Sequence, residues 1–129
     1  MSDDGSELLM FQVGARVYAS AVHDVVRIGS VRDVPEDELV EGTSLGPTFG
    51  RERGIVVNDD HDGTEATLVV DQVLGVRKVG EGELHALPPF AAAVLQTSAV
   101  AGIVVFDDAP TLLVDLPTLI RERRAAAAR

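Results

Sequence analysis

The chain has 129 residues, of which 46% are hydrophobic, 25% are charged and none is cysteine. That length predicts one domain over residues 1–129, with flexible ends at about 1–6 and 125–129, and excludes fold classes that need about 250 residues. Eleven basic against 21 acidic residues give a net charge of −10, which disfavours nucleic acid and anionic membrane surfaces as partners.

The absence of cysteine excludes a disulfide, a thiolate nucleophile and a cysteine-ligated zinc site. The first residues are acidic where a secretory signal would be basic, and no apolar run approaches the about 18 residues of a membrane span. We therefore expect a cytoplasmic protein without direct membrane insertion.

The chain is predicted to begin with a hairpin. An apolar run over residues 8–13 stops at Gly14, and alternation resumes over 16–20, which is typical of two strands joined by a tight turn. The valines of the next segment share one face of a helix, which favours a short helix over 22–27, although β-branched residues also suit a strand.

A second helix and a long loop follow. Residues 35–41 begin with proline, which suits the first helical position, and the three acids behind it complement the helix dipole. Residues 42–54 carry four glycines and a proline, so we expect a loop or an irregular edge there.

Short β-branched runs bounded by Gly, Pro and Asp dominate the rest of the chain. A closing helix is predicted over 116–124, because its cationic end suits a helix C-terminus. The fold class is therefore mostly β. The predicted strands are 54–58, 66–73, 75–79, 102–106 and 111–116, and we expect residues 68–70 and 103–105 to be buried.

One internal repeat organises these strands. GIVV at 54–57 and TLVVD at 67–71 are echoed by GIVV at 102–105 and TLLVD at 111–115. An acidic turn separates the two halves of each unit. The repeat implies two similar hairpins, and hence a domain of two sheets or small barrels.

The local motifs that would indicate a catalytic or metal-binding site are weak. Ser44 stands in a GxSxG pattern, but a hydrolase serine follows a strand and precedes a helix, whereas Ser44 follows a predicted helix and precedes a proline. Residues 58–63 resemble the start of a calcium loop, yet its twelfth position is Val69 and not glutamate. The three histidines lack ligand spacing. We expect no catalytic residues, no bound metal and no cofactor.

The order of these segments resembles CheW, a family of chemotaxis coupling proteins. The resemblance covers nearly the whole chain and rests on motifs of one Asp or Gly among apolar residues. These are VHDV at 22–25, the proline-led segment 35–42, LVVDQVLGV at 68–76, LHALPP at 84–89 and the stretch 100–120.

The resemblance implies a pair of small β-barrels or sheets and a non-enzymatic adaptor that joins a chemoreceptor's cytoplasmic tip to the regulatory domain of a histidine kinase. By position, it implies partner contacts at Val22, Asp24, Gly42, Val73 and Val76. The alternatives from other classes are a regulatory β-domain with a different protein partner, a metal-binding sensor and a small hydrolase.

One departure from the family pattern is large. Family members carry an Asn-Leu-Arg-Gly segment and a strand where this chain has only TSLGPTFGRERG, so the first half is expected to be incomplete. A sheet that loses a strand exposes an unpaired edge, here flanked by the charges at 51–53 and by Phe49 as an apolar cover. We predict that this edge docks a partner strand or self-associates, and that the kinase contact is lost.

Overall fold

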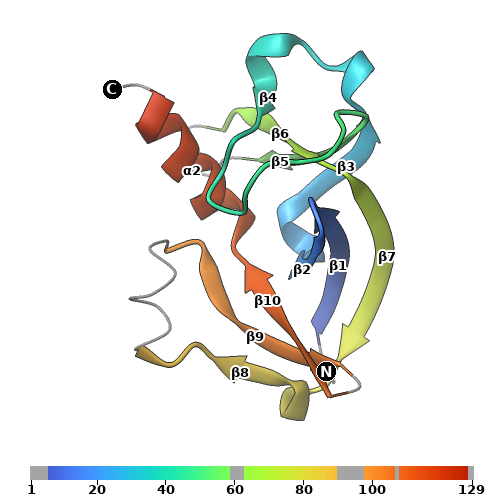
Figure 1. Cartoon of the computed structure of the whole chain (residues 1–129), viewed down its shortest axis with the longest axis vertical. Coiled ribbons are helices and arrows are strands. Elements are labelled where there is room, and N and C mark those ends of the chain that lie inside the picture. Colours follow the sequence, from blue (N-terminus) through green and yellow to red (C-terminus); the bar gives the residue numbers. More distant parts are fainter. Residues whose placement is uncertain (1–5, 59–62, 90–97, 107, 128–129) are drawn as a thin grey trace.

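The structure is a computed structural model that describes residues 6–58, 63–89, 98–106 and 108–127. These residues form two β-sheets, with one α-helix beside them (Figure 1). The strands are β1 (Ser6–Val13), β2 (Arg16–Ala21), β3 (Val25–Ser30), β4 (Leu39–Val40), β5 (Arg53–Asn58), β6 (Glu65–Val70), β7 (Gln72–Val79), β8 (Leu84–Ala86), β9 (Val100–Phe106) and β10 (Ala109–Val114). Helix α2 spans Leu116–Ala127, and single 3-10 turns are η1 (Val22–Asp24), η2 (Val31–Asp33), η3 (Glu36–Glu38) and η4 (Glu81–Glu83).

The larger sheet has the strand order β7-β1-β2-β10-β9-β8, and the smaller one has the order β3-β5-β6-β4. The β1–β2 hairpin is confirmed, with Val13 paired to Arg16 and Gly14 at a φ of 61° that favours glycine. The repeat is confirmed as two antiparallel hairpins, β5–β6 in the smaller sheet and β9–β10 in the larger one. The mostly β fold class is therefore confirmed.

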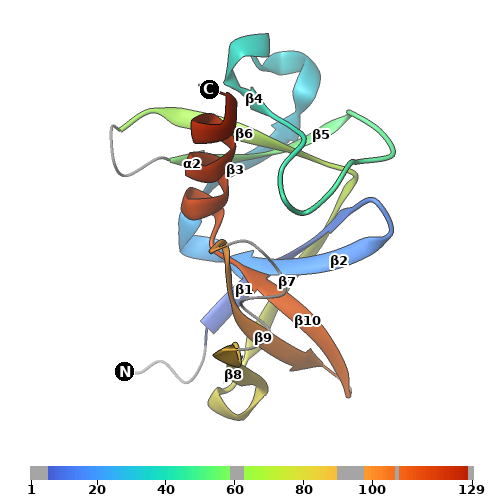
Figure 2. The ribbon, with the colours of Figure 1, turned by 60° about the vertical axis from the view of Figure 1, so that its left-hand side comes forward.

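Two hydrophobic cores hold the domain together. The main core lies between the sheets, where Phe11 of β1, Ile55 of β5 and Ile120 of α2 are all fully buried. Figure 2 shows α2 running alongside the smaller sheet. The second core joins Val79 of β7 to Val104 of β9, strands that are not neighbours in the sheet, so the larger sheet curls around it.

Both predicted N-terminal helices are wrong beyond their first turn. Only Val22–Asp24 is helical in the first, and the chain then enters β3, whose β-branched residues pair with β5. In the second, Glu36–Glu38 forms one 3-10 turn before β4, which pairs in parallel with β6. Strand pairing in the tertiary structure overrides the local helix signals.

Two strand boundaries also differ from the prediction. The strand expected over 66–73 stops at Val70, and Asp71 separates it from β7, which continues through the predicted 75–79 strand. The strand expected over 111–116 ends at Val114, because Leu116 begins α2. Residues 68–70 are buried as predicted, whereas only Val104 of residues 103–105 is buried.

Candidate partner-binding surfaces

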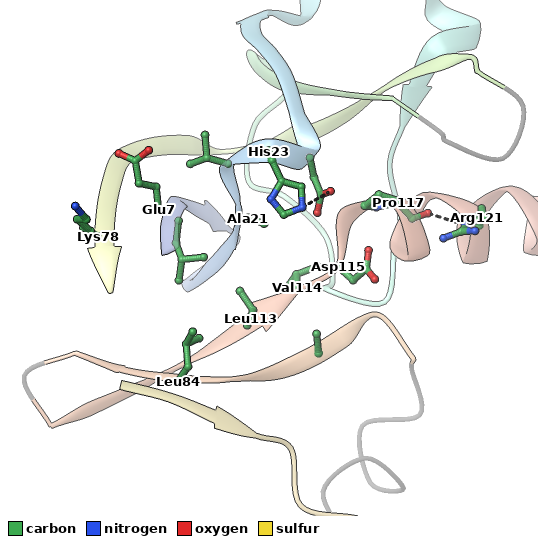
Figure 3. Close-up of a pocket in the computed structure, with 14 residues that line it drawn as sticks. Glu7, Ala21, His23, Lys78, Leu84, Leu113, Val114, Asp115, Pro117 and Arg121 are labelled. Carbon is green, nitrogen blue, oxygen red and sulfur yellow. Dashed lines mark hydrogen bonds and ion pairs between the residues drawn. The ribbon is translucent and has the colours of Figure 1, made fainter. Parts of the chain in front are cut away.

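A groove of about 870 Å³ lies between η1, the larger sheet and the start of α2. Leu84 and Leu113 form an apolar floor. Glu7 and Lys78 lie at one end of the groove and Arg121 at the other (Figure 3). An apolar floor with charges of both signs around it is the usual composition of a protein-binding surface.

Two of the predicted contact residues, Val22 and Asp24, line this groove. Val22 is half-buried and packs against the main core, so its position is set by the fold. The Asp24 carboxylate lies 3.4 Å from the ring of His23, whose side chain is 85% exposed. The 3-10 turn η1 directs these three residues toward the groove.

Val73 and Val76 belong instead to β7, which pairs with β1 and forms an edge of the larger sheet among the residues that the structure describes. Val73 is half-buried against the main core, and Val76 is 58% exposed. A register shift opposite Met10 and Phe11 disrupts the ladder here, and Gly75 has a φ of 135°. Bulges of this kind keep an edge strand from pairing freely, so β7 offers side chains more readily than backbone.

The remaining two predicted residues, Gly42 and Phe49, lie in the loop of residues 41–52, which contains no strand. Gly42 has a φ of 66° and is exposed, and the backbone carbonyl before it accepts a 2.7 Å hydrogen bond from Arg123 Nε of α2. Tyr18 donates a further bond to the Leu45 carbonyl. The glycine-rich loop is thus fixed to β2 and α2.

Asp71 is the main anchor of this loop. Its carboxylate accepts hydrogen bonds from the backbone N–H groups of Gly14 at 2.6 Å, Phe49 at 2.8 Å and Gly50 at 2.8 Å. Partial burial raises the pKa of Asp71, but the N–H groups of Phe49, Gly14 and Gly50 together outweigh burial and hold it below its ordinary value. One side chain therefore joins the β1–β2 turn to the loop.

Arg51 closes the other end of the loop. Its guanidinium donates two hydrogen bonds of 2.8 Å to the Glu41 carboxylate and lies 3.4 Å from Glu36. The bond to Glu41 is the largest of the effects that raise the pKa of Arg51. Arg51, predicted as one of the charges that protect a bare edge, is thus engaged within its own chain.

The side chain of Phe49, predicted as an apolar cover of an unpaired strand edge, is 79% exposed. Beside it lies a hollow of about 350 Å³, which is also lined by Gly42 and Val69. The hollow exists because β4 pairs only with Thr67 and Leu68, so no strand continues along β6 at Val69. The sequence analysis did not identify the Asp71 carboxylate that anchors this loop.

The other sequence motifs do not form a site in the described residues. Ser44 is exposed in the loop, and no three His, Asp or Glu side chains in the described part of the chain are grouped to hold a metal ion. Most of the calcium-like segment, residues 59–62, lies outside the described residues. None of the described helices is long and apolar enough to cross a membrane.

Two β-sheets, a groove beside the larger one and exposed apolar side chains are features that a protein-binding surface has. The chain belongs to the CheW-like domain family, whose model matches residues 39–124.

Known proteins of this kind are similar to the chain. The frizzy aggregation protein FrzB of Myxococcus xanthus is 36% identical over 110 residues, which cover 85% of this chain and 90% of FrzB. The crystal structure of the scaffolding protein TtCheW from Thermoanaerobacter tengcongensis has a TM-score of 0.67. The match covers 89% of this chain and 87% of TtCheW at 20% identity, so this likeness shows the fold.

Proposed function

We propose that this protein is a non-enzymatic coupling adaptor of a chemosensory pathway, acting in the cytoplasm without a cofactor. It binds the cytoplasmic tip of a chemoreceptor, the regulatory domain of a histidine kinase, or both. Membership of the CheW-like domain family carries this proposal, since the matched residues include β4 to β10 and most of α2.

The groove at η1 is the best candidate for the receptor contact. An amphipathic helix binds a groove by laying apolar side chains on its floor while its polar face meets the rim, so a helical segment of a receptor tip would fit here. Leu84, Leu113 and Val22 supply that floor, and Asp24 and Arg121 supply charged groups on the rim.

The kinase contact is proposed to be weakened or lost. The loop of residues 41–52 contains no strand. This supports the expectation, drawn from the family resemblance, that the Asn-Leu-Arg-Gly segment and the strand after it are missing here. Val73 and Val76 on the β7 edge, with Gly42 on the loop, are then the remaining candidates for a kinase surface. The protein would act on the receptor side and not as a complete bridge.

Pairwise binding measurements test the proposal. The purified protein is titrated with a receptor-tip fragment and with the kinase regulatory domain, beside a full-length coupling protein from the same cell. Val22→Asp should weaken receptor binding at least about tenfold, as expected of a central interface residue. Val17→Asp is the matched control, because Val17 is 40% exposed on β2 and does not line the groove.

Each outcome bears on a separate part of the proposal. Binding to neither partner would refute the coupling function. Receptor binding that Val22→Asp leaves unchanged would refute the assignment of the groove. Kinase binding as tight as that of the full-length protein would refute the lost contact.

A further inference from the structure

Phe49 is the most exposed of the large apolar side chains in the described chain, at 79%. Its backbone is nevertheless fixed, because its N–H group donates to both oxygens of Asp71, at 2.8 and 3.1 Å, and the N–H group of Gly50 donates to the same carboxylate. An aromatic side chain on a fixed backbone loses little conformational entropy when it binds, and this is typical of an interface anchor.

The hollow beside Phe49 can receive such a side chain. Its volume is about 350 Å³, and its lining combines the apolar Val13, Leu68 and Val69 with polar side chains that include Glu41 and Arg51. An apolar cavity of ~150 Å³ already holds a benzene ring. The hollow is therefore large enough for a phenylalanine side chain.

The charge of the loop favours contact between two copies. Residues 41–53 contain Glu41, Glu52, Arg51 and Arg53, and two acids against two bases give a local net charge of zero. The whole chain carries −10, so most other faces would repel a second copy. Arg53 and Glu52 are exposed and can pair across a two-fold axis.

We propose that this protein forms a two-fold symmetric dimer through residues 41–53, which are the loop and the first residue of β5, and that Phe49 of each copy enters the hollow of the other. A surface that carries an anchor and a receiving hollow side by side is self-complementary, which is what a two-fold interface requires. In this dimer each Phe49 fills the hollow beside the short β4 of the partner copy. The hollow of its own copy is filled by the partner's Phe49.

Sedimentation equilibrium on the full chain tests this proposal. The wild-type protein should show a reversible monomer–dimer equilibrium, and Phe49→Ala should raise the dissociation constant about a hundredfold, because two phenylalanines leave the interface together. Phe49→Leu should retain most of the affinity. Val26→Ala is the matched control, since Val26 is 45% exposed on β3 and does not line the hollow.

A complementation experiment separates the anchor from the hollow. Thr48 is half-buried and lines the hollow, so Thr48→Trp should fill it and give a monomer that still presents Phe49. Neither Thr48→Trp nor Phe49→Ala should dimerise alone. Their mixture should form a heterodimer of intermediate affinity, in which one Phe49 enters one open hollow, and thermal melts check that each variant is folded.

Several results would overturn the proposal. One is a wild-type monomer up to about 1 mM, the weak end of specific association. Another is a dimer that Phe49→Ala leaves intact. If the wild type is monomeric and Phe49→Ala instead weakens binding to the kinase domain or the receptor tip, Phe49 docks a foreign partner. Because coupling is measured by separate titrations, its failure would leave the dimer test unaffected.

Discussion

Replacing Asp71 by alanine should detach the loop of residues 41–52 from the β1–β2 turn. The buried N–H group of Gly14 would lose its acceptor, which costs about 1.5–3 kcal/mol for a bond to a charged group. Phe49 and Gly50 are exposed, so water can replace the carboxylate there and their bonds add only about 0.5 kcal/mol. We expect Asp71→Ala to lower the free energy of unfolding by about 2–3.5 kcal/mol.

The pH dependence of this loss follows from the lowered pKa of Asp71. A carboxyl whose pKa is lower in the folded than in the unfolded state stabilises the fold above the unfolded value of about 3.9. That stabilisation disappears as the pH falls through the folded pKa. The difference in the free energy of unfolding between wild type and Asp71→Ala should therefore be constant from about pH 7 to 5 and shrink below about pH 4.

Urea denaturation gives the free energies, and amide hydrogen exchange locates the change. In Asp71→Ala, hydrogen exchange should accelerate more at the amides of Gly14, Phe49 and Gly50, which are bonded to Asp71, than at the other amides. Asp33→Ala is the control, because Asp33 is an exposed acid. Unchanged stability and unchanged exchange at these amides in Asp71→Ala would refute the anchoring role.

Two further substitutions test the cores, one at an exposed serine gives their baseline, and a pair of glycine changes tests the sheets. By urea denaturation, Val70→Ala should cost about 2 kcal/mol because Val70 is fully buried in the main core, and Leu113→Ala about 1–2 because it is only partly buried in the second. Ser44→Ala should stay within about 0.5 kcal/mol, as Ser44 is exposed. Gly102→Ala should destabilise by about 1–3 kcal/mol, since its Cβ would lie 2.7 Å from the His85 carbonyl oxygen, whereas Gly29→Ala, with open space at Cβ, should cost little in thermal melts.

Local patterns in the sequence determined much of this fold. The alternation on both sides of Gly14 predicted the first hairpin, and the repeated GIVV and TLVVD-type runs predicted one hairpin in each sheet. These signals worked because period-two alternation and turn residues act between neighbours in the chain. The order of the same motifs also pointed to the CheW-like family.

Only the tertiary structure decided where short segments with mixed signals belong. Residues 25–28 and 39–40 became strands because β5 and β6 offered backbone partners distant in the sequence, and a local helix signal cannot register such partners. Asp71 is the clearest case. The sequence marked it as the last residue of a repeat, but its three N–H partners lie 57, 22 and 21 positions away, and only folding brings them to one carboxylate.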